Sequence, residues 1–125
     1  MAVISTPNAP AAIGPYSQGI VAGDFLFVSG QIPIVPETGN LVEGGIAEQT
    51  ERSLRNLIAI IEEAGADVSK IVKTSCYLAE IADFAAFNEV YGKMIDFAPA
   101  RACFAVKDLP KGALVEVEAI VYLGE

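Results

Sequence analysis

The chain has 125 residues, enough for a hydrophobic core, and we interpret residues 1–125 as a single domain. Its 16 acidic and 8 basic residues give a net charge of −8, and because Lys and Arg form no cluster, the composition argues against a nucleic-acid partner. The absence of histidine excludes Ser-His-Asp and Cys-His catalysis and, with two isolated cysteines, nearly every zinc site, so we expect no metal.

The first residues predict one short strand and one turn. Val3-Ile-Ser5 is typical of a short edge strand. Gly14-Pro15 then forces a turn, because glycine permits backbone conformations that other residues avoid and proline fixes its own φ. We expect this turn to present Tyr16 and Ser17.

The next element is a strand over Phe25-Leu-Phe-Val-Ser29, rich in aromatic and branched residues and ended by Gly30. Ser29 has two possible roles there. Its hydroxyl can hydrogen-bond the turn backbone, the commoner case, or it can face a pocket where Gly30 lets a ligand approach the main chain. Residues 32–45 predict a loop, with a hairpin turn at Glu37-Thr-Gly-Asn40.

A helix is predicted after this loop from an apolar stripe with helical spacing, followed by Gly65 in the position of a C-terminal cap. We interpret it as an amphipathic helix that covers the core. The stripe consists of Leu54, Leu57, Ile58 and Ile61.

Residues 71–78 alternate as a strand, with Val72, Thr74, Cys76 and Leu78 on one side. A second helix is predicted to begin after Asp83, a good N-cap residue, and to end before Pro99. Its apolar stripe consists of Phe84, Phe87, Tyr91 and Met94. Asn88 has a low helix propensity, so it is either tolerated on the polar face or supports a neighbouring loop.

Residues 99–106 and 114–121 each alternate as a strand, and Asp108-Leu-Pro-Lys-Gly112 between them contains turn residues. We therefore predict a β-hairpin. The alternation places Arg101, Cys103 and Ala105 on one side of the first strand. The hairpin register predicts that Arg101 and Glu116 share a face.

In such a hairpin Arg101 lies ~7 to ~13 Å from Glu116, at ~3.3 Å per residue, so direct contact is not expected. Two interpretations follow. The two charges can belong to a surface ion-pair ladder, which spacing alone favours. Alternatively, they can hold a small anionic molecule between them, with the arginine binding its carboxylate through two parallel hydrogen bonds.

Two helices can cover only one face of the predicted sheet. We expect the other face to carry Leu114, Ile120, Cys103 and Ala105, a surface too apolar to leave in water. With 53% apolar residues and no run of ~18 apolar residues that would cross a membrane, the chain is expected to bury this face against other subunits. Pockets would then form between chains.

Cys76 and Cys103 have neither metal-binding nor redox spacing. No cationic segment followed by an apolar signal core is found at the N-terminus. A reduced, cytoplasmic protein is therefore expected.

Three stretches resemble one known family. They are residues 9–18 (Ala-Pro-Ala-Ala-Ile-Gly-Pro-Tyr-Ser-Gln), residues 28–33 (Val-Ser-Gly-Gln-Ile-Pro) with the Thr38-Gly39 turn, and residues 99–106 continued by residues 115–119. In this order they resemble the Rid family of reactive intermediate deaminases, also called the YjgF family, and its RidA subgroup most closely.

The resemblance implies an α+β fold of the chorismate-mutase-like (bacillus) type, with a mixed sheet covered on one face by two helices. It also implies a homotrimer whose sheets form the central core, with three clefts between subunits. Such proteins hydrolyse 2-imino acids, such as 2-iminobutanoate and 2-iminopropanoate, or their enamine tautomers, to 2-keto acids and ammonia without cofactor or metal.

Position by position, the resemblance implies that Arg101 binds the substrate carboxylate and that Glu116 handles the water and the protons. The residues that line or shape the pocket would be Tyr16, Ser29, Gly30, Asn88 and Cys103. Cys103 is not expected to be a nucleophile, because no histidine is present to generate its thiolate.

Two other functions stay open. The same pocket could sense small carboxylates without turning them over, because an arginine and a polar rim suit binding equally well. Relatives have also been proposed to act as a translation-inhibiting nuclease or a holdase chaperone. The acidic composition and the absence of histidine argue against the nuclease, whereas nothing in the sequence argues against the chaperone.

Overall fold

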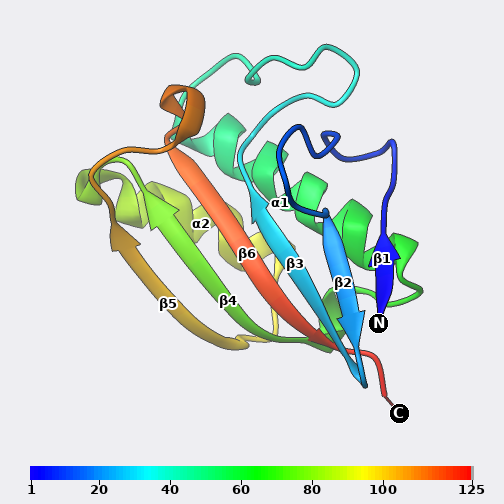
Figure 1. The fold of residues 1–125 in the computed structure, drawn as a ribbon. Coiled ribbons are helices and arrows are strands. Elements are labelled where there is room, and N and C mark those ends of the chain that lie inside the picture. The colour runs from blue at the N-terminus through cyan, green and yellow to red at the C-terminus, as the bar shows by residue number, and fades with distance from the viewer. Residues whose placement is uncertain (125) are drawn as a thin grey trace.

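The computed structural model describes residues 1–124, which form one six-stranded sheet and two α-helices (Figure 1). Both helices pack on the same face of the sheet, as the sequence predicts. The strands are β1 (Ala2–Ile4), β2 (Gly19–Ala22), β3 (Phe25–Gln31), β4 (Ile71–Leu78), β5 (Ala100–Ala105) and β6 (Val115–Tyr122), and the helices are α1 (Ile46–Glu63) and α2 (Phe84–Met94).

The strand order across the sheet is β1-β2-β3-β6-β4-β5, and every neighbouring pair is antiparallel except β4 and β5. The predicted hairpin is therefore wrong, because β4 lies between β5 and β6. The reason is the β4-α2-β5 crossover, which places β5 parallel to β4 at the outer edge of the sheet. The turn residues that suggested a hairpin instead form a short 3-10 turn, Pro110–Gly112, that leads the chain back across β4.

The core lies between the helices and the covered face of the sheet. Helix α1 buries Leu54, Leu57, Ile60 and Ile61 completely, whereas Ile58 from the predicted stripe is half-exposed. Each such side chain contributes roughly 1.5–3 kcal/mol when it leaves water. The helix ends as predicted, since Ala64 is its C-cap and the next residue, Gly65, has a φ of 87°.

The predicted assignment of faces is partly wrong. The register pairs Arg101 with Thr74 and Cys103 with Cys76, and both partners point into the core. Arg101, Cys103 and Ala105 therefore share one face, as predicted, but it is the helix-covered face and not the open one. The open face carries Phe25, Phe27, Tyr77, Phe104, Ile120 and Glu116.

Two strands differ locally from the prediction. The pairing of β4 with β6 shifts between Ile71 and Lys73, so Val72 is an extra residue in a bulge and is exposed. Ile71 takes the buried position instead. Strand β2 was not predicted, because Gly19 and the turn before Phe25 interrupt its apolar pattern. No helix among residues 1–124 is long and apolar enough to cross a membrane.

Candidate active site

A cavity of about 570 Å³ lies where the N-terminal segment, the end of β3, the Pro110–Gly112 turn and the start of β6 meet. Four of the residues that the sequence predicted for the site line it: Tyr16, Ser29, Gly30 and Glu116. They come from distant parts of the chain. The antiparallel pairing of β3 with β6 brings two of these parts together.

Glu116 is the acidic group at the centre of this arrangement. Its side chain lies against Gly30, and a β-carbon at that position would overlap the carboxylate. Glycine at position 30 therefore allows the carboxylate of Glu116 to take its observed position. Partial burial raises the pKa of Glu116 above that of an ordinary glutamate, and the negative charge of Glu118 raises this pKa further. Such a carboxylate is a better proton acceptor than an exposed one.

The wall of the cavity near Tyr16 is fixed by hydrogen bonds to the backbone. The Ser29 hydroxyl donates to the carbonyl of Ser17 at 2.6 Å, a backbone group outside the turn at Gly30, and Ser29 also lines the cavity. The buried amide of Gln18 binds the 6–10 segment, donating to the carbonyls of Thr6 and Pro10 at 3.1 and 2.8 Å. Tyr16 itself stays exposed at the cavity, in the turn after Gly14.

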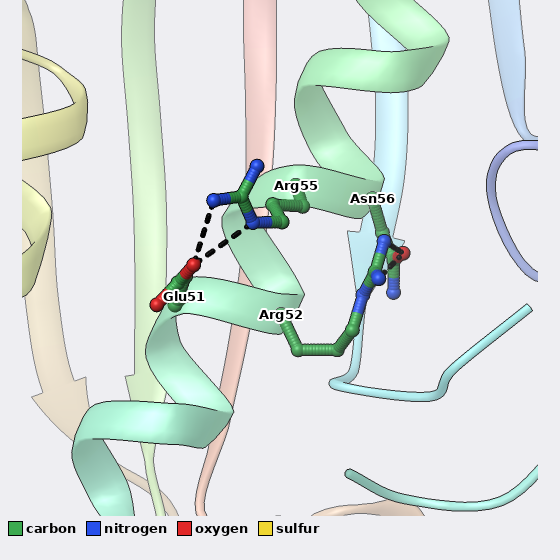
Figure 2. Close-up of polar contacts among 4 residues, drawn as sticks. All are labelled: Glu51, Arg52, Arg55 and Asn56. Atoms are coloured by element: carbon green, nitrogen blue, oxygen red, sulfur yellow. Dashed lines mark hydrogen bonds and ion pairs between the residues drawn. The ribbon is translucent and has the colours of Figure 1, made fainter.

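A second wall depends on one buried asparagine of α1. Asn56 donates from its side chain to the carbonyls of Ile32 and Ile34 at 3.2 and 2.9 Å, and both isoleucines line the cavity. Its Oδ1 accepts two hydrogen bonds from Arg52, whereas Arg55 pairs with Glu51 on the exposed side of the helix (Figure 2). The amide nitrogen of Asn56 thus holds the loop after β3, while Arg52 of the same helix occupies its amide oxygen.

Arg101 lies elsewhere, under α2. Its Nη1 donates to Oδ1 of Asn88 at 2.7 Å, and its guanidinium carbon lies 5.0 Å from the centre of the Tyr91 ring. The rings of Phe84 and Phe87 are within 6.0 Å. Hydrogen bonding and cation–π contact both fix the direction of the guanidinium. Asn88, Tyr91 and Arg101 line a hollow of about 360 Å³.

Cys103 follows Arg101 on the same face of β5 and is half-buried. Burial raises the pKa of the Cys103 thiol, although the nearby Arg101 charge opposes the increase. Its cross-strand neighbour Cys76 is buried, and burial raises the pKa of that thiol to about 12. Both thiols are therefore protonated at neutral pH, and neither is prepared to act as a nucleophile.

Arg101 and Glu116 do not share a face of the sheet, contrary to the prediction. Arg101 is in register with Thr74 and through it with Ala119, so it lies two strands and three residues from Glu116. At ~4.8 Å per strand and ~3.3 Å per residue, their α-carbons are roughly 14 Å apart. Because the sheet separates their side chains, one chain cannot place both around the same small molecule.

Lys111 and Glu118 also line the cavity, and sequence reasoning missed both. Lys111 looked like an ordinary turn residue before β6. Alternation along β6 does put Glu118 on the same face as Glu116, and that signal could have identified it. Among residues 1–124, no group of three or more His, Cys, Asp or Glu side chains is arranged to hold a metal ion.

The fold and this cavity define a class of small α+β proteins, the chorismate-mutase-like class, with an acidic group beside the central strands. Residues 6–123 match the family model described as Endoribonuclease L-PSP. The chain therefore belongs to this family, which is the YjgF or Rid family.

Individual relatives agree over nearly the whole chain. A RutC family protein of Pyrococcus abyssi is 53% identical over 96% of this chain and 95% of its own. The human 2-iminobutanoate/2-iminopropanoate deaminase is 45% identical over 98% of this chain and 90% of its own. The crystal structure of the YjgF gene product of E. coli superimposes with a TM-score of 0.94 at 42% identity, covering 98% of each chain.

Proposed function

We propose that this protein hydrolyses 2-imino acids, such as 2-iminobutanoate and 2-iminopropanoate, or their enamine tautomers, to 2-keto acids and ammonia. The observation that carries the proposal is the Glu116 carboxylate, which lies against Gly30 in a cavity and has a pKa raised by burial. The similarity to a human protein named for this reaction supports the same reaction class.

In the proposed reaction a water molecule attacks C2 of the imine. Glu116 accepts a proton from this water as the C–O bond forms and the electron pair of the C=N bond moves to nitrogen. The nitrogen takes up one proton from solvent and a second from Glu116, which returns the proton it accepted, and it leaves as ammonia while the hydroxyl proton passes to solvent and the C=O bond forms. No electron is gained or lost overall, and the imine carbon is already electrophilic, so the reaction calls for positioning and proton transfer.

Arg101 is proposed to bind the substrate carboxylate. Its guanidinium is held by Asn88 and Tyr91 and retains donors for a bidentate contact. Because Arg101 and Glu116 lie on opposite faces of one sheet, we infer that the site is completed between subunits, with Arg101 of one chain next to the Glu116 cavity of another.

The proposed assembly is a homotrimer built on the open face of the sheet. This face exposes large aromatic side chains that the helices do not cover, including Phe27 at 46% and Phe104 at 49%. Exposed apolar surface of this kind favours burial against another chain. A trimer would bury the open faces together and create clefts at their borders.

The deciding experiment generates 2-iminobutanoate in place with an amino-acid oxidase and follows the appearance of the ketoacid. We expect the rate to exceed spontaneous hydrolysis and to increase in proportion to the protein concentration. A ketoacid rate equal to the spontaneous one, together with binding of 2-oxobutanoate, would contradict the hydrolase and favour a carboxylate-binding module.

A further inference from the structure

The turn before β6 holds a lysine in an unusual backbone conformation. Lys111 has φ 59° and ψ 18°, in the left-handed region, and Gly112 after it has a φ of 71°. A residue with a β-carbon is disfavoured in this region, whereas glycine is not. A conformation of this kind persists only where the surrounding structure imposes it, and such residues concentrate at functional sites.

The surrounding structure does impose it here. The backbone NH of Ala113 donates to the carbonyl of Pro110 at 3.1 Å, and the backbone NH of Leu114 donates to Oε1 of Gln49 at 2.8 Å. Both Ala113 and Gln49 are buried. The turn is therefore anchored to α1. This fixes the backbone position from which the Lys111 side chain extends at the wall of the cavity.

Lys111 carries a charge opposite to those of the other ionised side chains around the cavity. Glu116 and Glu118 line the cavity, and the whole chain carries a net charge of −8, so the field inside opposes the entry of an anion. Among the residues that the structure describes around the cavity, Lys111 is the one cation. Neither of the two ion pairs found within residues 1–124 includes Lys111, so its charge is free to act on a ligand.

We propose that Lys111 is a substrate-capture residue, whose ammonium group attracts the carboxylate of an incoming small 2-imino or 2-keto acid into the cavity past Glu116 and Glu118. The inference rests on the proposed function and extends it, because it assigns binding to a second cation besides Arg101. Lys111 acts on the entry and binding of the anion, while proton transfer stays with Glu116. Its removal should therefore change KM much more than kcat.

The test compares steady-state kinetics of Lys111→Met, Lys111→Arg and the wild type. We expect Lys111→Met to raise KM about three- to tenfold and to leave kcat within about twofold. The reason is that the ligand carboxylate loses its attraction to one positive charge several ångströms away. Lys111→Arg, which keeps the charge, should restore most of the KM. The control is Lys107→Met, which removes an exposed lysine that does not line the cavity and should leave KM unchanged.

Salt dependence gives a readout that a purely structural role would not change. The ratio of the KM of Lys111→Met to the wild-type KM should fall toward one as ionic strength increases to about 0.3 M, because salt screens the attraction that Lys111 adds. Lys111→Gly separates capture from folding. Glycine accepts the left-handed turn, so its thermal midpoint should not fall, yet its KM should rise as in Lys111→Met.

Binding of 2-oxobutanoate, followed by NMR titration, keeps the proposal testable without turnover. Lys111→Met should raise its Kd by the same factor as KM, and it should do so even if the wild type does not hydrolyse imines. An unchanged Kd in Lys111→Met would overturn the capture role whether or not the protein is a hydrolase. An equal loss in Lys107→Met would also overturn it, since the effect would then come from net charge alone.

Discussion

The guanidinium of Arg101 and the side-chain amide of Asn88 are joined by a 2.7 Å hydrogen bond between β5 and α2. Asn88 therefore has a definite role that its low helix propensity only hinted at, because it fixes an arginine on the neighbouring strand. With the Tyr91 ring 5.0 Å away, the guanidinium is oriented before any ligand arrives. An anchor oriented in advance loses less conformational entropy on binding.

Asn88→Ala should weaken substrate binding without removing the charge of Arg101. We expect KM to rise about tenfold, since a hydrogen bond to a charged group contributes roughly 1.5–3 kcal/mol, part of which water replaces. Steady-state kinetics and a thermal unfolding scan would measure this. An unchanged KM in a folded variant would show that Asn88 does not orient Arg101 for binding.

Arg101→Lys tests whether the anchor is bidentate. A lysine ammonium keeps the charge but cannot form two parallel hydrogen bonds to a carboxylate, so we expect kcat/KM to fall roughly 10- to 100-fold. The measurement is ketoacid formation from imine generated in place. Arg101→Ala should be at least as impaired, and full activity in that variant would refute the assignment of Arg101.

Glu116→Gln keeps the shape of the side chain and removes the base. We expect ketoacid binding to persist while kcat falls by about 10²-fold or more. In the wild type, kcat/KM should decrease as the pH falls through a pKa that lies above that of ordinary glutamate, because the protonated acid cannot accept a proton. A wild-type pH profile identical to that of the variant would leave Glu116 without a role as base.

The raised pKa of Glu116 also predicts how the stability of Glu116→Gln should differ from that of the wild type as the pH changes, and this difference serves as a control. The folded protein raises the pKa of Glu116, so folding favours the protonated form, and the wild type loses this stability as the pH rises through the folded pKa. Glu116→Gln has no such loss. Its thermal midpoint should therefore rise relative to that of the wild type as the pH increases from about 4 through the folded pKa of Glu116.

Gly30→Ala should displace the carboxylate of Glu116 while preserving the fold. The added methyl group would overlap the flexible end of Glu116, which can turn away, so the backbone need not move. A misplacement of about 1 Å can cost 10²-fold in rate, and we expect a loss of that order in kcat. Circular dichroism would check the fold, and an active, folded variant would contradict the close-contact model.

The assembly can be tested by mixing inactive variants. Arg101→Ala and Glu116→Gln are unfolded together in equal amounts and refolded, and light scattering coupled to gel filtration is expected to give the mass of a trimer. If Arg101 and Glu116 of one site come from different chains, about a quarter of the sites regain both residues, since each chain is the right one half the time. Mixed trimers without activity would refute the shared site.

Local patterns in the sequence were sufficient to predict the helices and most strands. The apolar stripe of α1 and the cap at Gly65 are properties of a single segment, so they could be identified without knowledge of its neighbours. The pairing of one strand with another, in contrast, is not a property of a single segment. Residues 100–105 and 115–122 alternate correctly, but periodicity does not say that β4 lies between them.

Because periodicity does not identify strand partners, one prediction at the candidate site was also wrong. Alternation grouped Arg101 with Cys103 and Ala105 correctly, but it could not decide which face the helices cover. The hairpin assumption then placed Arg101 beside Glu116. Conversely, the contact between Gly30 and Glu116 depends on the pairing of β3 with β6, two segments that are far apart in the chain, so no local pattern encodes it.

The position of β6 has a consequence for how the protein is made. The last strand of the chain lies between β3 and β4 and is the link that joins β1-β2-β3 to β4-β5. Because β6 is synthesised after the other five strands, β3 and β4 each keep an unpaired edge, which can attract other chains, until residues 115–122 are available. The six-stranded sheet can therefore be completed only after β6 has emerged from the ribosome.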